Sequence, residues 1–435
     1  MGDFCHASLR AGRDKYPAKL FTPDMRPSRR KILAALTTTL IAGGMLFAAA
    51  PQANAAWTVK GGGFGHGVGM SAYGAYGMAQ HGWSHKKILR HYYSGTKIRE
   101  VRKSHDVKVL LKTDSGTAYF SGAKRACGIK LNQNRTYGGR LKGSRIILVR
   151  RSGKKLAGCK RKLRTESTGK VIFKGLGRYR GGVIMVPSGG GLNVINRVGI
   201  NAYVKGVIPN ESIPSWPMKA LRAQAVASRT FALSGGRDGD GFDLYNDTRS
   251  QVYGPMSTEY SRTSRAASQT SNQIVSYKGD PVLTVFSSSS GGHTENAENV
   301  FFGGSVPYLK GVKDPFDDVS PYHRWTVSFS NSDMNSRLGS YVNGRLKKVK
   351  ITRYGVSKRI VWARLYGTGG VSKIRGDNFQ YALGLLDRLV FSVKKGSRID
   401  RTSAAVQSAG ELPPGMGTVA PNSVPNTAPA TTSEG

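Results

Sequence analysis

The segment that joins Val204–Ile208 to Pro217–Leu233 constrains the fold more than any other part of this 435-residue chain. Its first part is a short apolar run that predicts a β-strand, and Pro209 ends this run. Pro217 suits the first turn of a helix, where its missing N–H costs nothing. The Ala, Leu, Gln and Arg residues that follow it are good helix formers. We therefore predict a strand, a turn that presents the carboxylate of Glu211, and a helix over Pro217–Leu233.

The position of Glu211 on this turn is open to two interpretations. A strand–turn–helix unit can hold a catalytic group rigidly. A Glu near the start of a helix also caps the helix or complements its dipole, and this is the more common role. The segment by itself favours capping, so the case for catalysis depends on the rest of the chain.

The rest of the chain mixes strands and helices. Between His105 and Val186, short apolar runs alternate with Gly and basic turns, which is typical of a β-meander. A helix is expected from Ser257 to about Thr270, and another over Phe379–Leu385. These patterns predict an α+β fold with an antiparallel, β-rich core and a few helices. Further strands are expected at Gln273–Tyr277, Val282–Ser287, Lys348–Tyr354, Ile360–Arg364 and Arg388–Val393.

The segment Gly63–Ile98 begins with a Gly-rich loop, and glycine allows tight turns that expose the backbone. Two helices are expected after this loop, over Tyr73–Gln80 and Lys86–Tyr93. The buried face of the second helix is expected to consist of Ile88, Leu89 and Tyr92.

The N-terminus has the pattern of an export signal. Basic residues within Arg26–Lys31 precede the apolar run Ile32–Ala50, and Ala53–Ala55 fits a small-x-small cleavage site. We expect residues 1–55 to be a signal peptide of a secreted protein, with Met25 as an alternative start. A membrane-spanning anchor is the other interpretation. The tail 396–435 is rich in Ser, Pro, Thr and Ala and is expected to be disordered, because it cannot bury a core.

The formal net charge of +41 falls to +36 without residues 1–55, which hold eight basic and three acidic residues. Folding does not require such an excess, so the charge indicates polyanionic surroundings. Nucleic acid is the usual first candidate, but an exported chain rarely meets it and the basic residues form no recognisable nucleic-acid-reading module. Anionic polymers of a bacterial cell wall fit better, and the charge would also suit a polyanion binder without enzymatic activity.

Two cysteines, Cys127 and Cys159, follow the expected signal, and two cysteines in an exported protein most simply form a disulfide. A thiol nucleophile is the alternative, although no local motif supports it. His81 and His85 have the i, i+4 spacing of some zinc ligands, and His91 lies nearby. Because no carboxylate or Cys accompanies them, we expect no metal and no cofactor.

The segment around Glu211 and four further blocks resemble the stage II sporulation protein D / amidase enhancer (SpoIID/LytB) family. In that family the GHGVGM block normally closes the domain at its C-terminus, so the resemblance implies a SpoIID-like fold in circularly permuted order. The matching blocks are Tyr179–Pro209, Asp243–Pro255 (DLYNDTRSQVYGP), Val282–Pro315 (with SSSSGGHTE) and Gly63–Ile98 (with GFGHGVGMSAYG). The expected division is then a signal at 1–55, the Gly-rich block at 56–98 as part of the core, a β-rich region at 99–178, the SpoIID/LytB core at 179–395 and the tail.

The resemblance to the lytic members of the family implies a peptidoglycan lytic transglycosylase. Such an enzyme cleaves the bond between N-acetylmuramic acid (MurNAc) and N-acetylglucosamine (GlcNAc) with a single carboxyl group and leaves 1,6-anhydro-MurNAc ends. Glu211 matches the catalytic Glu of the family, although Ser212–Pro214 is one residue longer than the common form that follows this Glu. The other branch of the family implies a non-catalytic, wall-binding enhancer of an N-acetylmuramoyl-L-alanine amidase. Both branches carry the Glu, so the sequence leaves both functions open.

Further residues are expected to contact glycan strands. The Ser287–Glu295 stretch offers hydroxyl groups and two glycines that permit close backbone approach, with an ordinary polar turn as the alternative. Glu295 is the second candidate acid, His66 is either a substrate contact or structural, and Arg229 is expected to pair with a buried carboxylate. The complete expected set is His66, Ser289, Ser290, Gly291, Gly292, His293, Thr294, Glu295, Gln224 and Arg229.

The permuted order leads to a geometric prediction. The Gly63–Ile98 block should lie beside Arg388–Val393, because the family order makes these two segments neighbours. It should also complete the site that contains Glu211, with the side chain of His66 within roughly 15 Å of that of Glu211.

Overall fold

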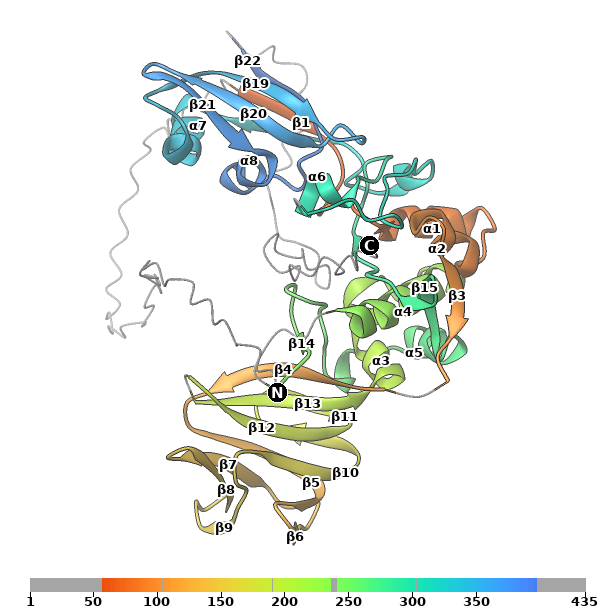
Figure 1. Ribbon diagram of the computed structural model, residues 1–435, viewed down its shortest axis with the longest axis vertical. Coiled ribbons are helices and arrows are strands. Elements are labelled where there is room, and N and C mark those ends of the chain that lie inside the picture. The colour runs from red at the N-terminus through yellow and green to blue at the C-terminus, as the bar shows by residue number, and fades with distance from the viewer. Residues whose placement is uncertain (1–56, 103–104, 190, 236–240, 302, 397–435) are drawn as a thin grey trace, which may run out of the picture. The chain divides into compact units, whose positions relative to one another are not determined.

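The computed structural model describes residues 57–396, except 103–104, 190, 236–240 and 302 (Figure 1). Over these residues the fold is α+β with a strand-rich antiparallel core, as predicted. The expected signal peptide and nearly all of the expected tail lie outside the described residues. Within the described ranges, no helix is both long enough and apolar enough to cross a membrane.

The largest sheet holds eleven strands. Its hydrogen-bonded order is β14-β4-β13-β12-β10-β5-β7-β8-β9, with β11 paired to β10 and β6 to β5, and every pair is antiparallel except β14 with β4. Alternate residues such as Ala118 and Phe120 face the core. The strands are β4 (Asp106–Asp114), β5 (Thr117–Ala126), β6 (Ile129–Lys130), β7 (Tyr137–Lys142), β8 (Arg145–Arg150), β9 (Lys155–Gly158), β10 (Leu163–Phe173), β11 (Gly177–Arg180), β12 (Gly182–Ser188), β13 (Gly191–Gly199) and β14 (Leu244–Tyr245).

This sheet contains strands from both sides of residue 178, the expected boundary between the β-rich region and the family core. β10 precedes that position and β12 follows it, yet Leu163 of β10 lies opposite Met185 of β12. The two expected regions are therefore continuous through main-chain hydrogen bonds. Cys127, in the turn between β5 and β6, forms the predicted disulfide with Cys159, which follows β9.

Three helices pack together after the sheet: α3 (Ile200–Glu211), α4 (Met218–Ser234) and α5 (Ser261–Gln269) (Figure 1). α4 is the helix that the sequence predicts, but the strand predicted over Val204–Ile208 is wrong, because these residues lie inside α3. Pro209 falls in the last turn of α3 and the helix ends two residues later. The buried positions recur every three or four residues, as on one face of a helix, at Ile200, Tyr203, Val204, Val207 and Ile208.

The segment before the serine stretch also differs from its prediction. Only Phe286–Ser287 (β17) of the predicted strand Val282–Ser287 is a strand, and it pairs with β2 (Met70–Ser71). Val282 and Val285 instead pack into the core that includes residues of α4. The helix expected from Ser257 is observed as α5, after a 3-10 turn over Met256–Thr258.

The residues that lead into the Gly63–Ile98 block lie beside the C-terminal strand, and the permuted order stays a prediction. β1 (Trp57–Gly61) is the central strand between β18 (Trp325–Phe329) and β22 (Val390–Lys395), with Trp57 opposite Lys395. Inside the block, Gly65 N donates to Leu386 O at 3.0 Å. The block continues into α1 (Ala72–Gln80) and α2 (His85–Tyr92), whose buried residues are Ile88, Leu89 and Tyr92, as predicted.

Two smaller sheets complete the fold. In one, the order is β19-β20-β21, and its core includes residues of α7 and α8; in the other, the order is β16-β15-β3. The predicted strand Gln273–Tyr277 is observed with the same bounds, and the predicted strands at Lys348, Ile360 and Arg388 and the helix at Phe379 are observed with shifted ends. The remaining elements are β3 (Lys97–Glu100), β15 (Gln273–Tyr277), β16 (Asp280–Pro281), α6 (Ala297–Phe301), a 3-10 turn over Asp317–Val319, α7 (Asn331–Leu338), a 3-10 turn over Gly339–Tyr341, β19 (Leu346–Tyr354), β20 (Ile360–Gly367), β21 (Gly370–Arg375) and α8 (Gly376–Leu383).

Candidate functional site

Glu211 is the last residue of α3, so its carboxyl group lies at the carbonyl end of that helix. The side chain is partly exposed, and its Oε1 accepts a hydrogen bond of 2.8 Å from Val252 N. Burial raises the pKa of Glu211 to about 8, and the Val252 N–H opposes this shift. The negative end of the helix dipole acts in the same direction as burial. Glu211 is therefore largely protonated at neutral pH, as a general acid requires.

A glycine positions the loop that carries Val252. Gly206 of α3 faces this loop, and its O accepts a hydrogen bond of 3.0 Å from Gly254 N. A Cβ on Gly206 would lie 2.6 Å from the ring of Tyr253 and 2.9 Å from Gly254 O. The absence of a side chain therefore lets the loop come close enough for Val252 N to reach Glu211.

Tyr203 and Gln251 form a second polar pair in this region. Tyr203 OH donates to Gln251 Oε1 at 3.1 Å. Burial, followed by the charges of Tyr253 and Glu211, raises the pKa of Tyr203. Gln251 is 1% exposed, and its Nε2 has no hydrogen-bond partner among the described residues. No local sequence pattern singles out Tyr203, Gln251 or Val252, although the last two lie in the Asp243–Pro255 block.

Trp216 connects the Glu211 segment to the N-terminal block. Its ring centroid lies 5.1 Å from that of Tyr73 and 5.2 Å from that of Tyr76, and both tyrosines belong to α1. Tyr73 also lies 6.3 Å from Tyr322. Trp216 is buried, whereas the three tyrosines are partly exposed. The block thus contacts the segment that follows Glu211, and the predicted distance between His66 and Glu211 stays a prediction.

The hydroxyl groups of the serine stretch are bonded inside the protein. Ser289 Oγ donates to Asp317 Oδ2 at 2.8 Å, Ser290 Oγ donates to Asp314 Oδ2 at 2.7 Å, and both serines are fully buried. Ser71 of the N-terminal block also donates to Asp317, at 2.8 Å. Burial and the charge of Asp317 raise the pKa of Asp314 to about 7. These serines join two chain segments, and their hydroxyl groups do not face a ligand.

The other members of this stretch are held in the same way. A Cβ on Gly291 would lie 2.9 Å from Gly63 N, so this glycine permits contact with the N-terminal block rather than with a sugar. Thr294 is buried, and its Oγ1 accepts a backbone N–H at 2.8 Å. Gly292 and His293 keep partial exposure. The buried residues of this stretch therefore do not have the substrate-binding role that was expected for them.

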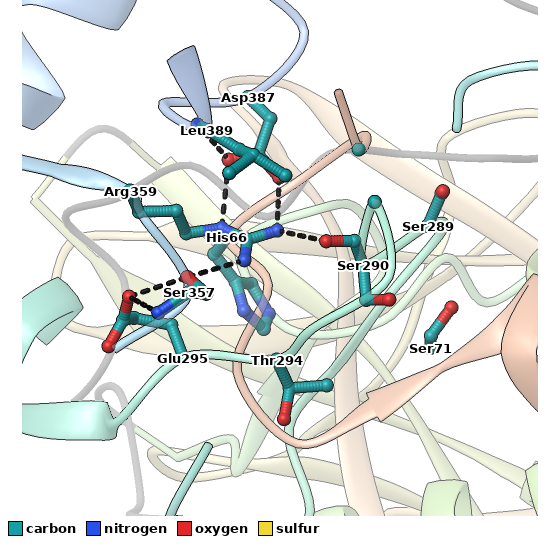
Figure 2. Close-up of polar contacts among 12 residues, drawn as sticks. His66, Ser71, Ser289, Ser290, Thr294, Glu295, Ser357, Arg359, Asp387 and Leu389 are labelled. Atoms are coloured by element: carbon teal, nitrogen blue, oxygen red, sulfur yellow. Dashed lines mark hydrogen bonds and ion pairs between the residues drawn. The ribbon is translucent and has the colours of Figure 1, made fainter. Parts of the chain in front are cut away.

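Glu295, the second candidate acid, is a structural carboxylate (Figure 2). It is fully buried, and its Oε2 accepts hydrogen bonds from both Ser357 Oγ at 2.5 Å and Ser357 N at 3.0 Å. Its Oε1 accepts three more, from Asn296 N, Val356 N and Asn299 Nδ2. Burial acts to raise the pKa of Glu295, but these donors together lower it. A carboxyl group that is ionised and fully bonded at neutral pH is unsuited to donate a proton.

A buried ion pair between Arg359 and Asp387 lies at the centre of this region (Figure 2). Arg359 Nη2 and Asp387 Oδ2 are 2.6 Å apart, and both side chains are almost fully buried. Arg359 also donates to Ser290 O at 3.0 Å and to Ser357 Oγ at 2.9 Å. A Cβ on Gly67 would collide with the guanidinium group. The Gly-rich loop therefore wraps closely around this ion pair, which explains its glycines without a ligand.

His66 is drawn next to Arg359 in Figure 2 and is held by protein groups. Its Nδ1 accepts a hydrogen bond of 3.0 Å from Val68 N, and its ring lies 5.5 Å from that of Phe301. Burial, followed by the charges of Arg359 and Arg388, lowers the pKa of His66 to about 3. A neutral, anchored imidazole favours the structural one of the two roles that the sequence left open.

Arg229 and Gln224 support the helices. Arg229 donates to Asn201 Oδ1 at 2.8 Å and to the backbone oxygens of Ala267 and Gln273, both at 3.1 Å. The expected pairing with a carboxylate is wrong, because amide and carbonyl oxygens of α3, α5 and β15 surround this guanidinium group. Gln224 is buried, and its Nε2 donates to a serine one turn further along α4 at 3.3 Å.

The three histidines considered as zinc ligands bond to different protein groups. His81 Nδ1 bonds to Gly77 O, His85 Nε2 to Gln273 Oε1, and His91 Nε2 to a lysine carbonyl oxygen. Across the described part of the chain, no three His, Cys, Asp or Glu side chains are grouped so as to hold a metal ion.

Comparison with known proteins relates part of this chain to a described family. Residues 188–277, which contain Glu211, match the family described as Stage II sporulation protein, SpoIID. The chain is 40% identical over 166 residues to an uncharacterized protein of Brachyspira hyodysenteriae, 39% over 134 residues to the amidase enhancer of Bacillus subtilis, and 28% over 208 residues to the stage II sporulation protein D of B. subtilis. These matches cover 38%, 31% and 44% of this chain and 45%, 18% and 59% of the relatives, so less than two thirds of each relative is spanned. The segment 188–277 therefore belongs to the SpoIID family, and the curated relatives support the same relationship for the chain around it.

Proposed function

We propose that this protein acts in the bacterial cell wall as an exported peptidoglycan lytic transglycosylase, with Glu211 as its catalytic acid and base. The observation that carries the proposal is the state of Glu211, which is partly exposed and has a pKa raised to about 8 by burial. The match to the SpoIID family covers this residue and supports the same assignment.

The proposed reaction needs one carboxyl group and no water. Protonated Glu211 gives its proton to the oxygen that leaves on GlcNAc, and the bond from that oxygen to the anomeric carbon of MurNAc breaks. The resulting carboxylate takes the proton of the C6 hydroxyl of MurNAc, whose oxygen closes on the same anomeric carbon. The products are a 1,6-anhydro-MurNAc end and a free GlcNAc 4-hydroxyl, and Glu211 is protonated again.

The neighbours of Glu211 supply orientation in this scheme. Val252 N holds one carboxyl oxygen and stabilises the charged form that acts as base. Tyr203 fixes the orientation of the buried Gln251 side chain, which lies beside Val252.

Digestion of purified glycan strands tests the proposal. Wild-type protein is expected to release fragments with anhydro-MurNAc ends, detected by mass spectrometry on intact strands and on strands stripped of stem peptides. Glu211→Gln is expected to lower the yield by about a hundredfold or more, because the residue supplies both proton transfers. Glu295→Gln is the matched control for the identity of the acid. Undiminished yield from Glu211→Gln, or no anhydro product from the wild type, would contradict the proposal.

The second candidate function is a non-catalytic enhancer of a cell-wall amidase, favoured by the 39% identity to the amidase enhancer of B. subtilis. In that case the protein binds sacculi, releases nothing alone, and accelerates an added N-acetylmuramoyl-L-alanine amidase. Acceleration that survives Glu211→Gln would support this function over the first, since no acid is then needed.

A further inference from the structure

We propose that an exposed basic face on the eleven-stranded sheet binds a phosphate-bearing anionic polymer of the cell wall. The face is defined by Arg125, Lys130, Arg140, Lys142 and Arg145. The inference rests on the envelope location in the proposed function. It adds a binding surface that is distinct from Glu211 and contributes nothing to the chemistry.

The charge of this part of the sheet is strongly one-sided. Residues 115–181 contain 19 Lys and Arg residues and a single acidic residue, Glu166. All of these basic residues except Arg180 are exposed. Within the described residues, the ion pairs found for this segment are Arg125–Glu166 and Arg180–Glu259. The first has 3.9 Å between its charged atoms and more than half of each side chain exposed, so it neutralises little.

The basic side chains lie at exposed positions of neighbouring strands. Phe120 and Ala126 of β5 are buried, whereas Arg125 is exposed and lies opposite Lys130 of β6. On the neighbouring hairpin, Lys142 of β7 lies opposite Arg145 of β8, and Arg140 lies two residues away on the same side of the pleat. All five side chains are exposed, with Arg125 and Lys130 near one end of β5 and the other three near its opposite end, where Arg140 lies opposite Thr117.

These pairs oppose folding rather than assist it. Like charges directly opposite across two strands are destabilising, and Arg125–Lys130 and Lys142–Arg145 are both such pairs. The disulfide Cys127–Cys159 links the turn of the first pair to the segment after β9 and helps hold this part of the sheet together. A bound polyanion would turn the repulsion into binding free energy.

The remaining surface indicates which polyanion fits. The aromatic residues of 115–181 are all buried or partly buried, so the face lacks the exposed rings on which single-stranded nucleic acid stacks. Ile172, 39% exposed, is the large apolar residue exposed in this segment, which is too little for insertion into a membrane surface. A flexible polymer of phosphodiesters without bases needs only charge, and that is what the face provides.

A second basic surface, on β19–β21, provides the comparison. There the cations lie against the protein's own rings: Lys373 lies 4.1 Å from the ring of Trp362, and Lys348 lies 5.9 Å from the ring of Tyr366. Tyr354 is 43% exposed. Two cations of this second surface thus already interact with aromatic rings of the protein, and the exposed aromatic ring of the surface suits a different kind of ligand.

Binding of the mature chain to poly(glycerol phosphate) tests the inference. The basic-face variant carries Arg125→Gln, Lys130→Gln, Arg140→Gln, Lys142→Gln and Arg145→Gln. The control carries five matched changes on the other basic surface, Arg345→Gln, Lys347→Gln, Lys348→Gln, Lys350→Gln and Arg364→Gln. Wild-type affinity is expected to fall steeply with salt. At about 50 mM salt the affinity of the basic-face variant for the polymer should be roughly tenfold or more below that of the wild type, and it should depend less steeply on salt. The affinity of the control should fall by less than about threefold.

Several results would overturn the inference. Equal losses in the two variants would show that net charge alone attracts the polymer. Tighter wild-type binding to double-stranded DNA, or to vesicles with anionic lipid, than to the polymer at equal phosphate and salt would assign the face to those partners. The double variant Lys142→Gln/Arg145→Gln should show about half of the loss of affinity for the polymer. It replaces the variant with five substitutions if that variant fails to fold.

The experiment separates this inference from the proposed enzymatic function. Both variants are expected to release anhydro-MurNAc from polymer-free glycan strands at the wild-type rate, because none of the altered residues lies near Glu211 in the proposed chemistry. On whole sacculi, the basic-face variant should bind less, and removal of phosphate polymers with hydrofluoric acid should abolish its difference from the wild type. If the protein has no transglycosylase activity but still binds the polymer through this face, the proposed enzymatic function is contradicted and the inference about the basic face stands.

Discussion

The proton affinity of Glu211 depends on residues that are distant in the sequence. Val252, which bonds its carboxyl group, is 41 positions away and is brought close by the contact of its loop with Gly206. The position of the carboxyl at the end of α3 adds the unfavourable end of the helix dipole. The candidate acid could be named from the sequence, but its protonation state could not.

The raised pKa of Glu211 predicts the pH dependence of activity. The acid must be protonated at the start of the reaction, so the rate should be steady at lower pH and fall as the pH rises through about 8. Initial rates of anhydro-product release between about pH 5 and 9.5 measure this. His66, with its pKa lowered to about 3, should not titrate in this range. A rate that increases through pH 8 would show that an ionised Glu211 starts the reaction.

The same shift predicts a stability effect. The folded state keeps a proton on Glu211 that the unfolded state releases near the ordinary pKa of 4.5. The free energy of unfolding should therefore fall as the pH rises from about 4.5 towards 8. Glu211→Gln should remove part of this fall and raise the melting temperature at pH 8. Glu295→Gln should lower it, because the pKa of Glu295 is lowered in the folded state. The opposite order of the two variants would contradict the assignment.

Gly206→Ala tests the contact that positions the loop. The new Cβ would meet the ring of Tyr253 and Gly254 O, so the loop must move away from α3. We expect a loss of about 1–3 kcal/mol in the free energy of unfolding and reduced activity, measured by chemical denaturation and product release. Gly158→Ala on β9, where a Cβ meets nothing within 4 Å, is the control. Equal effects of the two changes would count against the proposed role of the contact.

At the scale of elements, helices with a continuous run of good formers and strands with clear alternation were predicted well. α4, α8, β19 and β20 are examples. α3 was missed because a short apolar run with a following proline suits either a strand or the last turns of a helix. The deciding signal was the spacing of Ile200 and Tyr203, before that run, with Val204 and Val207 inside it. That spacing stabilises a helix only when the apolar face that it creates packs against the sheet and α5.

The ion pair Arg359–Asp387 holds several elements together, and breaking it should be costly. Asp387→Asn leaves a buried, uncompensated guanidinium group, so we expect about 3–5 kcal/mol lower stability. Urea unfolding measures this. The double variant Arg359→Met/Asp387→Leu should be less destabilised than the single one, because it leaves no buried charge. A single variant as stable as the wild type would show that the pair is not needed to anchor the Gly-rich loop.

At the scale of the whole molecule, the first and last strands of the described chain lie side by side. Trp57 of β1 lies opposite Lys395 of β22 in an antiparallel pair. The start of one strand is thus beside the end of the other, which is the arrangement of a hairpin without its loop.

A permuted chain tests this arrangement. Joining residue 395 to residue 57 with a short Asn-Gly-containing turn, and opening the chain between β3 and β4, gives the order that the resemblance to the family implies. We expect a soluble protein with wild-type activity and a similar melting temperature. Deletion of residues 57–98 is expected to give an insoluble protein, because it removes the central strand β1 and the buried face of α2. A soluble, fully active deletion variant would show that the block is an accessory.

The sequence alone determined the α+β class, the family, the paired cysteines and the candidate acid, because these depend on local pattern, residue type and spacing. Tertiary structure decided which polar residues remain available for chemistry. From the sequence, the serine stretch, Glu295 and His66 resemble binding residues. Yet Ser289 and Ser290 donate to aspartates 28 and 24 positions away, Glu295 accepts from Ser357, 62 positions away, and His66 lies beside a buried ion pair. Whether a hydroxyl group or carboxylate faces solvent or a buried partner is set by long-range packing, which no local pattern encodes.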